Sequence, residues 1–147
     1  MDTMNKATTV IDADGLILGR MASRIAKRLL EGEQIVIINA EKAILSGRKR
    51  SKINEAKEFL DVGGVGRGPF HYRRPDRIVK KAIRGMLPIR QPKGLRAYRR
   101  LKVFIRVPNN LIGHKIDTLT DAQVKKLTCS YFTVGELAKG IGWNQGE

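Results

Sequence analysis

The order of apolar and polar positions at the start of the chain predicts a strand, a helix and a second strand. Residues 8–11 are β-branched or apolar, and an Asp-Ala-Asp-Gly turn sequence follows them. Between Leu18 and Leu30 apolar residues recur three and four positions apart, opposite Arg and Lys, and Gly32 follows as a stop. Residues 34–39 contain four consecutive apolar residues, as in a strand buried within a parallel sheet. The three elements form a β-α-β unit.

The rest of the chain is predicted to contain shorter elements and one long loop. Residues 61–75 are rich in glycine and have no helical or alternating period, which predicts the loop. The other predicted elements are a strand at 43–45, a helix capped by Ser51 and running to about Leu60, a helix capped by Asp76 and ended by Pro88, a helix at 94–101, a strand at 103–107, and two helices at about 121–127 and 134–140 that begin with capping-box patterns. No internal repeat or second-domain boundary is visible, so residues 1–147 are expected to form a single domain.

The distribution of charge along the chain gives the first indication of function. The segment from Arg48 to Arg106 holds 19 of the 29 Lys and Arg but only four of the 14 acidic residues, so it carries the whole formal net charge of +15. The flanks are neutral. A chain adjusted only for solubility would spread one sign of charge over its surface. The concentration of cations therefore indicates a polyanionic partner, of which nucleic acid is the commonest.

The basic region, about residues 46–106, contains both helical faces and local clusters of cations. Arg48-Lys49-Arg50, Arg73-Arg74 and Arg99-Arg100 are clusters that phosphate contacts exploit. The Lys and Arg opposite the apolar stripe of the helix at 18–30 have two possible roles. They either contact phosphates or form a solvated basic face, which is ordinary on an amphipathic helix.

The loop combines small, cationic and aromatic residues over 63–75. Glycine lets a backbone approach phosphate, arginine contacts phosphate with a planar fork, and an aromatic ring stacks on an unpaired base. Phe70, His71 and Tyr72 are the candidate stacking side chains. The alternative is that Phe70 and Tyr72 fill the core beneath the loop.

Enzymatic, metal-binding and membrane functions find little support. The glycines fit neither a phosphate-binding P-loop nor a dinucleotide fingerprint. His71 and His114 have no nucleophile pattern beside them, Asp12 and Asp14 fit turn chemistry, and the single Cys129 is expected to be a small core residue. One cysteine excludes an internal disulfide, and no signal peptide or membrane-length apolar stretch is present. We expect a cytoplasmic protein without metal, cofactor or small-molecule substrate.

Several sequence runs resemble one family, the universal large-subunit ribosomal protein L13 family (uL13), in its archaeal and eukaryotic form. The matching runs, in family order, are residues 11–15, 18–23, 38–42, 46–49, 67–73, 83–88 and 100–103. The resemblance covers about Val10 to Val107. After Leu87-Pro88 the family usually has a His-Lys pair, whereas this chain has Ile89-Arg90. The chain also lacks the long C-terminal extension of eukaryotic members, which favours the archaeal form, and the segment beyond Pro108 matches no recognised motif.

The resemblance implies a three-layer α/β/α fold around a small, mainly parallel four-stranded sheet with basic loop extensions. It implies a non-catalytic constituent of the large ribosomal subunit that binds large-subunit (23S) rRNA directly, supports assembly, and lies as a monomer among neighbouring ribosomal proteins. An RNA- or DNA-binding protein outside the ribosome and an RNA-modifying enzyme are the alternatives. The predicted RNA-binding residues are Arg20, Ser46, Gly47, Arg48, Lys49, Arg50, Arg67, Gly68, Phe70, His71, Tyr72, Arg73, Arg74, Arg77, Lys80, Arg84, Arg90, Lys93, Arg96, Arg99, Arg100 and Lys102.

Overall fold

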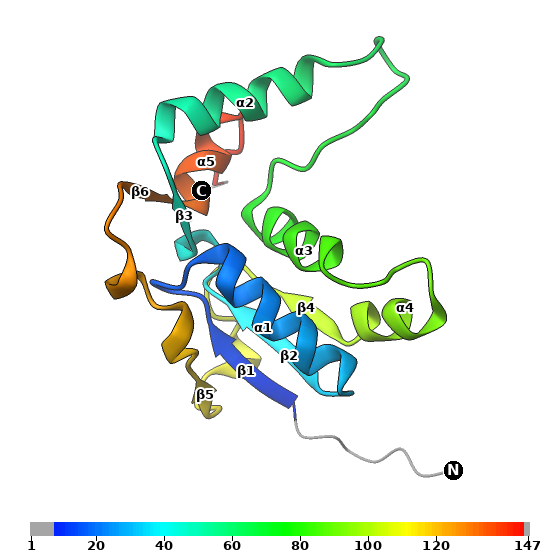
Figure 1. The fold of residues 1–147 in the computed structure, drawn as a ribbon, viewed down its shortest axis with the longest axis vertical. Coiled ribbons are helices and arrows are strands. Elements are labelled where there is room, and N and C mark those ends of the chain that lie inside the picture. The colour runs from blue at the N-terminus through cyan, green and yellow to red at the C-terminus, as the bar shows by residue number, and fades with distance from the viewer. Residues whose placement is uncertain (1–7, 146–147) are drawn as a thin grey trace.

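A four-stranded parallel sheet forms the centre of the protein in the computed structural model, which describes residues 8–145 (Figure 1). Its strands are β1 (Thr8–Asp12), β2 (Gln34–Ile38), β4 (Leu101–Val103) and β5 (Ile116–Asp117), in the order β4-β2-β1-β5. Every neighbouring pair is parallel. Helix α1 (Leu18–Leu30) connects β1 to β2. The α/β class with a small, mainly parallel four-stranded sheet is therefore confirmed.

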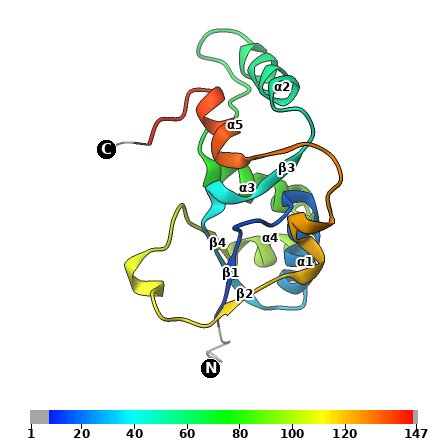
Figure 2. The ribbon, with the colours of Figure 1, turned by 90° about the vertical axis from the view of Figure 1, so that its left-hand side faces the viewer.

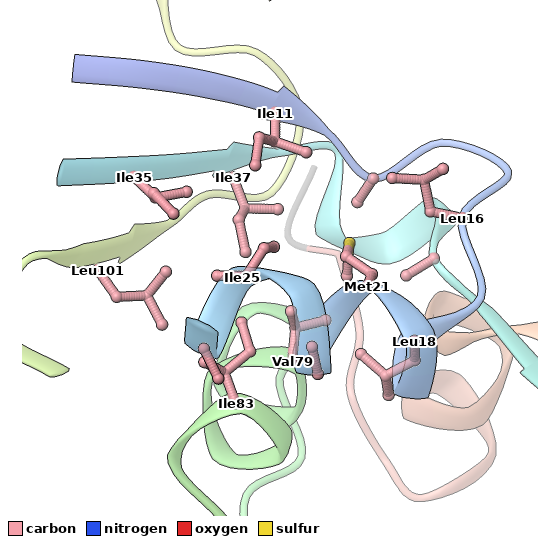
Figure 3. Close-up of a cluster of buried hydrophobic side chains, with 14 of the residues drawn as sticks. Ile11, Leu16, Leu18, Met21, Ile25, Ile35, Ile37, Val79, Ile83 and Leu101 are labelled. Atoms are coloured by element: carbon pink, nitrogen blue, oxygen red, sulfur yellow. The ribbon is translucent and has the colours of Figure 1, made fainter. Parts of the chain in front are cut away.

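One face of the sheet packs against α1, and the main core lies between them (Figure 3). Ile11 and Ile37 of adjacent strands, and Met21 and Ile25 of α1, are completely buried there. Helices α3 (Pro75–Gly85) and α4 (Pro92–Arg99) pack beside α1 and extend the same core. Burial of each such side chain stabilises the fold by about 1.5–3 kcal/mol, so these contacts provide the frame that holds the basic segment.

The opposite face of the sheet carries a smaller apolar cluster. Val10, Val36 and Ile38 point to this side and pack with Phe104 and Leu111. The covering residues belong to the segment that follows β4 and contains the 3-10 turn η2 (Asn109–Leu111). Figure 2 shows this segment on the side of the sheet away from α1 and α4. The covering layer here is irregular backbone, while the helices of the core lie on the other face.

A two-stranded antiparallel sheet lies beside the core and holds the start of the basic segment. It pairs β3 (Ile44–Ser46) with β6 (Tyr131–Thr133). Helix α5 (Val134–Gly140) follows β6 directly, with the capping box that the sequence predicts between Thr133 and Glu136. Helix α2 (Lys49–Asp61) follows β3 and contacts α5, which fixes one end of the long basic loop.

Several predicted boundaries are wrong, mostly because tertiary contacts decide them. Helix α2 begins at Lys49 with Arg48 as its N-cap, not at Ser51. Helix α3 begins at Pro75, which lacks the N–H that a first helical residue leaves unpaired, so Asp76 lies in the first turn instead of at the cap. The strand predicted at 103–107 begins earlier and is shorter. It is β4, Leu101–Val103, because Leu101 pairs with Ile35 of β2.

The C-terminal third differs more from the prediction. The expected helix at 121–127 is two 3-10 turns, η3 (Thr120–Ala122) and η4 (Val124–Lys126). Another 3-10 turn, η1 (Ala40–Lys42), lies earlier in the chain, between β2 and β3. Strands β5 and β6 are unpredicted. They have two and three residues, too few to show an alternating pattern.

Candidate nucleic-acid interface

The basic segment forms a continuous path along one side of the molecule. In Figure 1 it runs from α2 at the top, through the loop at 62–74, to α3 and α4. The loop and α2 project from the core, whereas α3 and α4 pack against α1. The side chains of α2 are not buried at any position. The segment thus joins a cationic part that is packed on the core to a cationic part that projects from it.

Ion pairs distinguish the basic segment from its flanks. Outside it, Arg24 pairs with Asp121, Arg28 with both Glu33 and Asp117, and Lys42 with Asp14.

Within the segment the ion pairs are few relative to its cations. They are Lys49 with Glu136, Lys52 with Glu55, and Arg74 with Asp76. Across residues 8–145, the other cations of the segment have no carboxylate partner. Most of the local positive charge is therefore uncompensated, which is the electrostatic condition for binding a polyanion.

Most of the predicted binding residues are exposed to solvent. Five are half-buried, namely Gly47, Gly68, His71, Lys80 and Arg100. The exposed ones are Arg20, Ser46, Arg48, Lys49, Arg50, Arg67, Phe70, Tyr72, Arg73, Arg74, Arg77, Arg84, Arg90, Lys93, Arg96, Arg99 and Lys102. All of them except Arg20 lie on the path from the end of β3 to β4. Arg84 and Arg90 line one hollow together with Lys81, which the sequence analysis did not select.

The loop directs two of its three rings away from the core. Phe70 is 84% exposed and Tyr72 is 46% exposed, so the alternative in which they fill the core is wrong. His71 is half-buried, with its ring centroid 5.8 Å from that of Phe59 and its Nδ1 3.4 Å from Lys81 Nζ. The exposed rings are available for stacking on bases.

Two cation–π pairs lie around a shared hollow at the start of α3. The Arg77 guanidinium lies 5.9 Å from the Tyr72 ring centroid, and Lys80 Nζ lies 5.0 Å from that of Tyr98. The hollow is lined by Tyr72, Asp76, Arg77, Lys80, Tyr98 and Val103. Tyr98 and Asp76 are additional candidates. Tyr98 has no sequence feature that indicates its proximity to Tyr72, because the packing of α4 beside α3 and β4 brings them together.

Two of the predicted RNA-binding residues, Arg100 and Arg20, are placed differently from the rest of the set. The Arg100 side chain turns inward, and its Nη2 donates a 2.6 Å hydrogen bond to the Leu29 carbonyl oxygen at the end of α1. Arg20 is exposed on α1, which lies outside the basic segment in the sequence. Arg24 and Arg28 on the same helix bond to acids of the protein itself, so this basic face partly stabilises the fold.

The other sequence candidates form no catalytic arrangement. Asp12 Oδ1 accepts hydrogen bonds from the Asp14 N–H at 2.9 Å and from Asn39 Nδ2 at 3.0 Å, as turn chemistry predicts. Cys129 is exposed, so its expected place in the core is wrong; it lies in the link between η4 and β6. Among residues 8–145 no group of three or more His, Cys, Asp or Glu side chains is placed to hold a metal ion. No helix in the same range has the length and apolar character to cross a membrane.

Comparison with known proteins identifies the family. The family model described as Ribosomal protein L13 matches residues 6–110. The chain belongs to this family. Proteins named large ribosomal subunit protein uL13 are similar over almost the whole chain. The one from Archaeoglobus fulgidus is 46% identical over 143 residues, covering 96% of this chain and 92% of that protein.

Two further archaeal uL13 proteins extend this finding. The Methanosarcina barkeri protein is 46% identical over 136 residues, and the Methanocaldococcus jannaschii protein is 44% identical over 143 residues. Each match covers 91% of this chain and 97% of the relative. The resemblance to the archaeal form is confirmed, and these names are those of ribosomal proteins, not of enzymes. Because the alignments cover more than nine tenths of the chain, they also include residues after Pro108, where the sequence analysis found no motif.

Proposed function

We propose that this protein is a structural constituent of the cytoplasmic large ribosomal subunit, binds large-subunit rRNA directly through its basic segment, and supports subunit assembly. The observation that carries the proposal is the uncompensated charge of the segment from Arg48 to Arg106 on an otherwise neutral frame. Membership of the L13 family supports the ribosomal assignment. Other large-subunit proteins would be its neighbours, with one copy in each subunit.

The mechanism follows from the two parts of the segment. Helices α3 and α4 are fixed to the core and would hold Arg84, Lys93, Arg96 and Arg99 at constant spacing against phosphates. Helix α2 and the loop project outward and would reach a second RNA segment with Arg67 and Arg73. A-form RNA hides its major groove from side chains, so shape and phosphate position would determine binding more than base identity. The protein would thus hold together RNA segments that are distant in sequence.

Salt dependence of the affinity for purified large-subunit rRNA tests the electrostatic mechanism. If the segment neutralises about 6–10 phosphates, affinity should fall by roughly 10³–10⁵ between 50 and 200 mM salt, a figure taken from duplex DNA. An affinity that stays constant across this range would contradict the proposal. Competition with duplex DNA separates this proposal from the DNA-binding alternative. A DNA-binding protein would release the rRNA and bind the duplex instead.

A pair of double variants tests whether the segment is the binding surface. Arg73→Ala with Arg74→Ala removes two exposed cations from the segment, of which Arg74 also pairs with Asp76 inside it, and we expect weaker rRNA binding with the fold retained. Arg24→Ala with Lys42→Ala removes two cations that are paired with acids outside it. Equal losses of affinity would assign binding to net charge alone. Co-sedimentation of the wild-type chain with the large subunit in native lysate then tests the ribosomal location.

A further inference from the structure

We propose that the hollow at the start of α3 binds an unstacked guanine base of the RNA. The inference rests on the proposed function and adds one base-specific site to a surface that otherwise contacts phosphates. The hollow is lined by two tyrosines, two cations, one carboxylate and Val103. Phosphate contacts alone need neither the rings nor the carboxylate.

The aromatic side chains supply surfaces for stacking. Tyr72 is exposed in the loop before α3, and Tyr98 is half-buried in α4. Arg77 and Lys80 lie over these rings at 5.9 and 5.0 Å. Unpaired RNA bases stack on aromatic rings and on guanidinium planes. Each of the two cation–π pairs therefore offers a group on which a base can stack.

Asp76 makes the hollow selective for a base with two adjacent donors. Its side chain is only 16% exposed, and it is one of four acids in the basic segment. Its Oδ1 accepts the Arg77 N–H at 2.9 Å and lies 3.3 Å from Arg74 Nε. Both contacts use Oδ1, and a carboxylate has about four acceptor positions in total, so Oδ2 can accept further donors.

Guanine matches this set of groups better than the other three bases. Its N1–H and 2-amino group are adjacent donors for a carboxylate, and its O6 and N7 are the acceptors that Arg and Lys recognise. Adenine and cytosine each place an acceptor next to their amino donor, and uracil places acceptors on both sides of its single N–H. Each of these would hold a lone pair against the Asp76 carboxylate, which is unfavourable. A phosphate would likewise be repelled by Asp76 while gaining nothing from the rings.

Binding of short oligouridylates with one central substituted nucleoside to the full chain tests the inference. We expect the oligonucleotide with guanosine to bind about tenfold more tightly than the all-uridine one. Inosine, which keeps N1–H but lacks the 2-amino group, should give an intermediate affinity. Equal affinities for all of these oligonucleotides would overturn the guanine site while leaving the electrostatic proposal intact. Failure to bind any of them would overturn both.

Matched variants locate the preference. Asp76→Asn replaces an acceptor oxygen by a donor and should reduce the guanosine preference to nearly one, while binding to oligouridylate is retained or strengthened. Glu58→Gln removes the same charge from an exposed position on α2 outside the hollow and should keep the tenfold preference. Tyr98→Ala should weaken the preference and Tyr98→Phe should preserve it, which provides a second test if Asp76→Asn unfolds. A preference that survives both Asp76→Asn and Tyr98→Ala would overturn the assignment.

Discussion

The Arg100 guanidinium donates a 2.6 Å hydrogen bond from Nη2 to the carbonyl oxygen of Leu29. Leu29 lies in the last turn of α1, and its carbonyl oxygen also accepts the backbone N–H of Gly32 at 3.1 Å. Arg100 comes directly before β4, whose Leu101 pairs with Ile35 of β2. The bond therefore ties the end of α1 to the edge of the sheet, and it gives an arginine of the basic segment a role inside the fold.

Replacement by alanine should lower stability at Arg100 and rRNA affinity at the adjacent Arg99. Arg100→Ala removes a charge-assisted hydrogen bond and should lower the free energy of unfolding by about 1.5–3 kcal/mol. Arg99→Ala removes an exposed cation and should change stability by less than about 0.5 kcal/mol while it weakens rRNA binding. Equilibrium urea unfolding and rRNA titration of both variants check this. Equal stability of the two variants would show that the bond to Leu29 contributes nothing.

The contact between α4 and the turn before it should make Gly94 sensitive to substitution. A Cβ atom at Gly94 would overlap the main-chain oxygen of Pro88, closer than any real Cβ contact. Because the obstructing atoms are backbone, Gly94→Ala should shift α4 and cost about 1–3 kcal/mol in urea unfolding. The control is Gly85→Ala in α3, where the Cβ would meet no atom within 4 Å. Gly85→Ala should be neutral or slightly stabilising, and an equally mild Gly94→Ala would contradict this packing.

The sequence predicted those parts of the fold whose pattern is local. The apolar spacing of α1 is a property of thirteen consecutive residues, and the four apolar residues of β2 indicate burial on both faces. Strand β5 has two residues and exists because Ile116 and Asp117 pair with β1. Nothing in two residues can indicate that pairing. The start of β4 is likewise decided by its distant partner, Ile35.

The candidate site shows the same division between local and distant information. The concentration of charge is a local property of the sequence, and the cations follow one another along the chain from α2 through the loop to α3 and α4. Arg99 and Arg100 are adjacent arginines, however, and nothing in the sequence shows that only Arg100 bonds to the Leu29 carbonyl oxygen. The approach of Tyr98 to Lys80 also depends on how α4 packs, so the hollow they line could not be predicted.

The burial of β2 makes the central strand a test of the sheet. Ile37 has no exposed surface and packs against α1, so Ile37→Ala should lower the free energy of unfolding by about 2–5 kcal/mol. Ile112, after η2, is 69% exposed, and Ile112→Ala should change stability by less than about 0.5 kcal/mol. Urea unfolding of both variants measures the difference. A similar small cost for the two would contradict the assignment of Ile37 to the core.

The capping box of α5 should make stability depend on pH in a defined direction. The Glu136 carboxylate accepts the Thr133 N–H at 3.0 Å, and this hydrogen bond, aided by nearby Lys49, holds the pKa of Glu136 below its ordinary value. A lowered folded-state pKa means that the stabilisation is complete above the ordinary glutamate pKa and disappears as the pH falls through the folded-state value. The contribution of the Glu136 charge should therefore be lost on going from about pH 6 to about pH 3.

Two variants separate the charge of Glu136 from the cap itself. Glu136→Gln keeps a side-chain oxygen for the Thr133 N–H but cannot ionise, so its stability should lie below that of the wild type near neutral pH and approach it in acid. Thr133→Ala removes the oxygen that accepts the Glu136 N–H and should cost about 1 kcal/mol at neutral pH, while Thr133→Ser should cost much less. Urea unfolding of the three variants and the wild type at several pH values provides the comparison. A constant difference between the wild type and Glu136→Gln across this range would show that the lowered pKa of Glu136 is not coupled to folding.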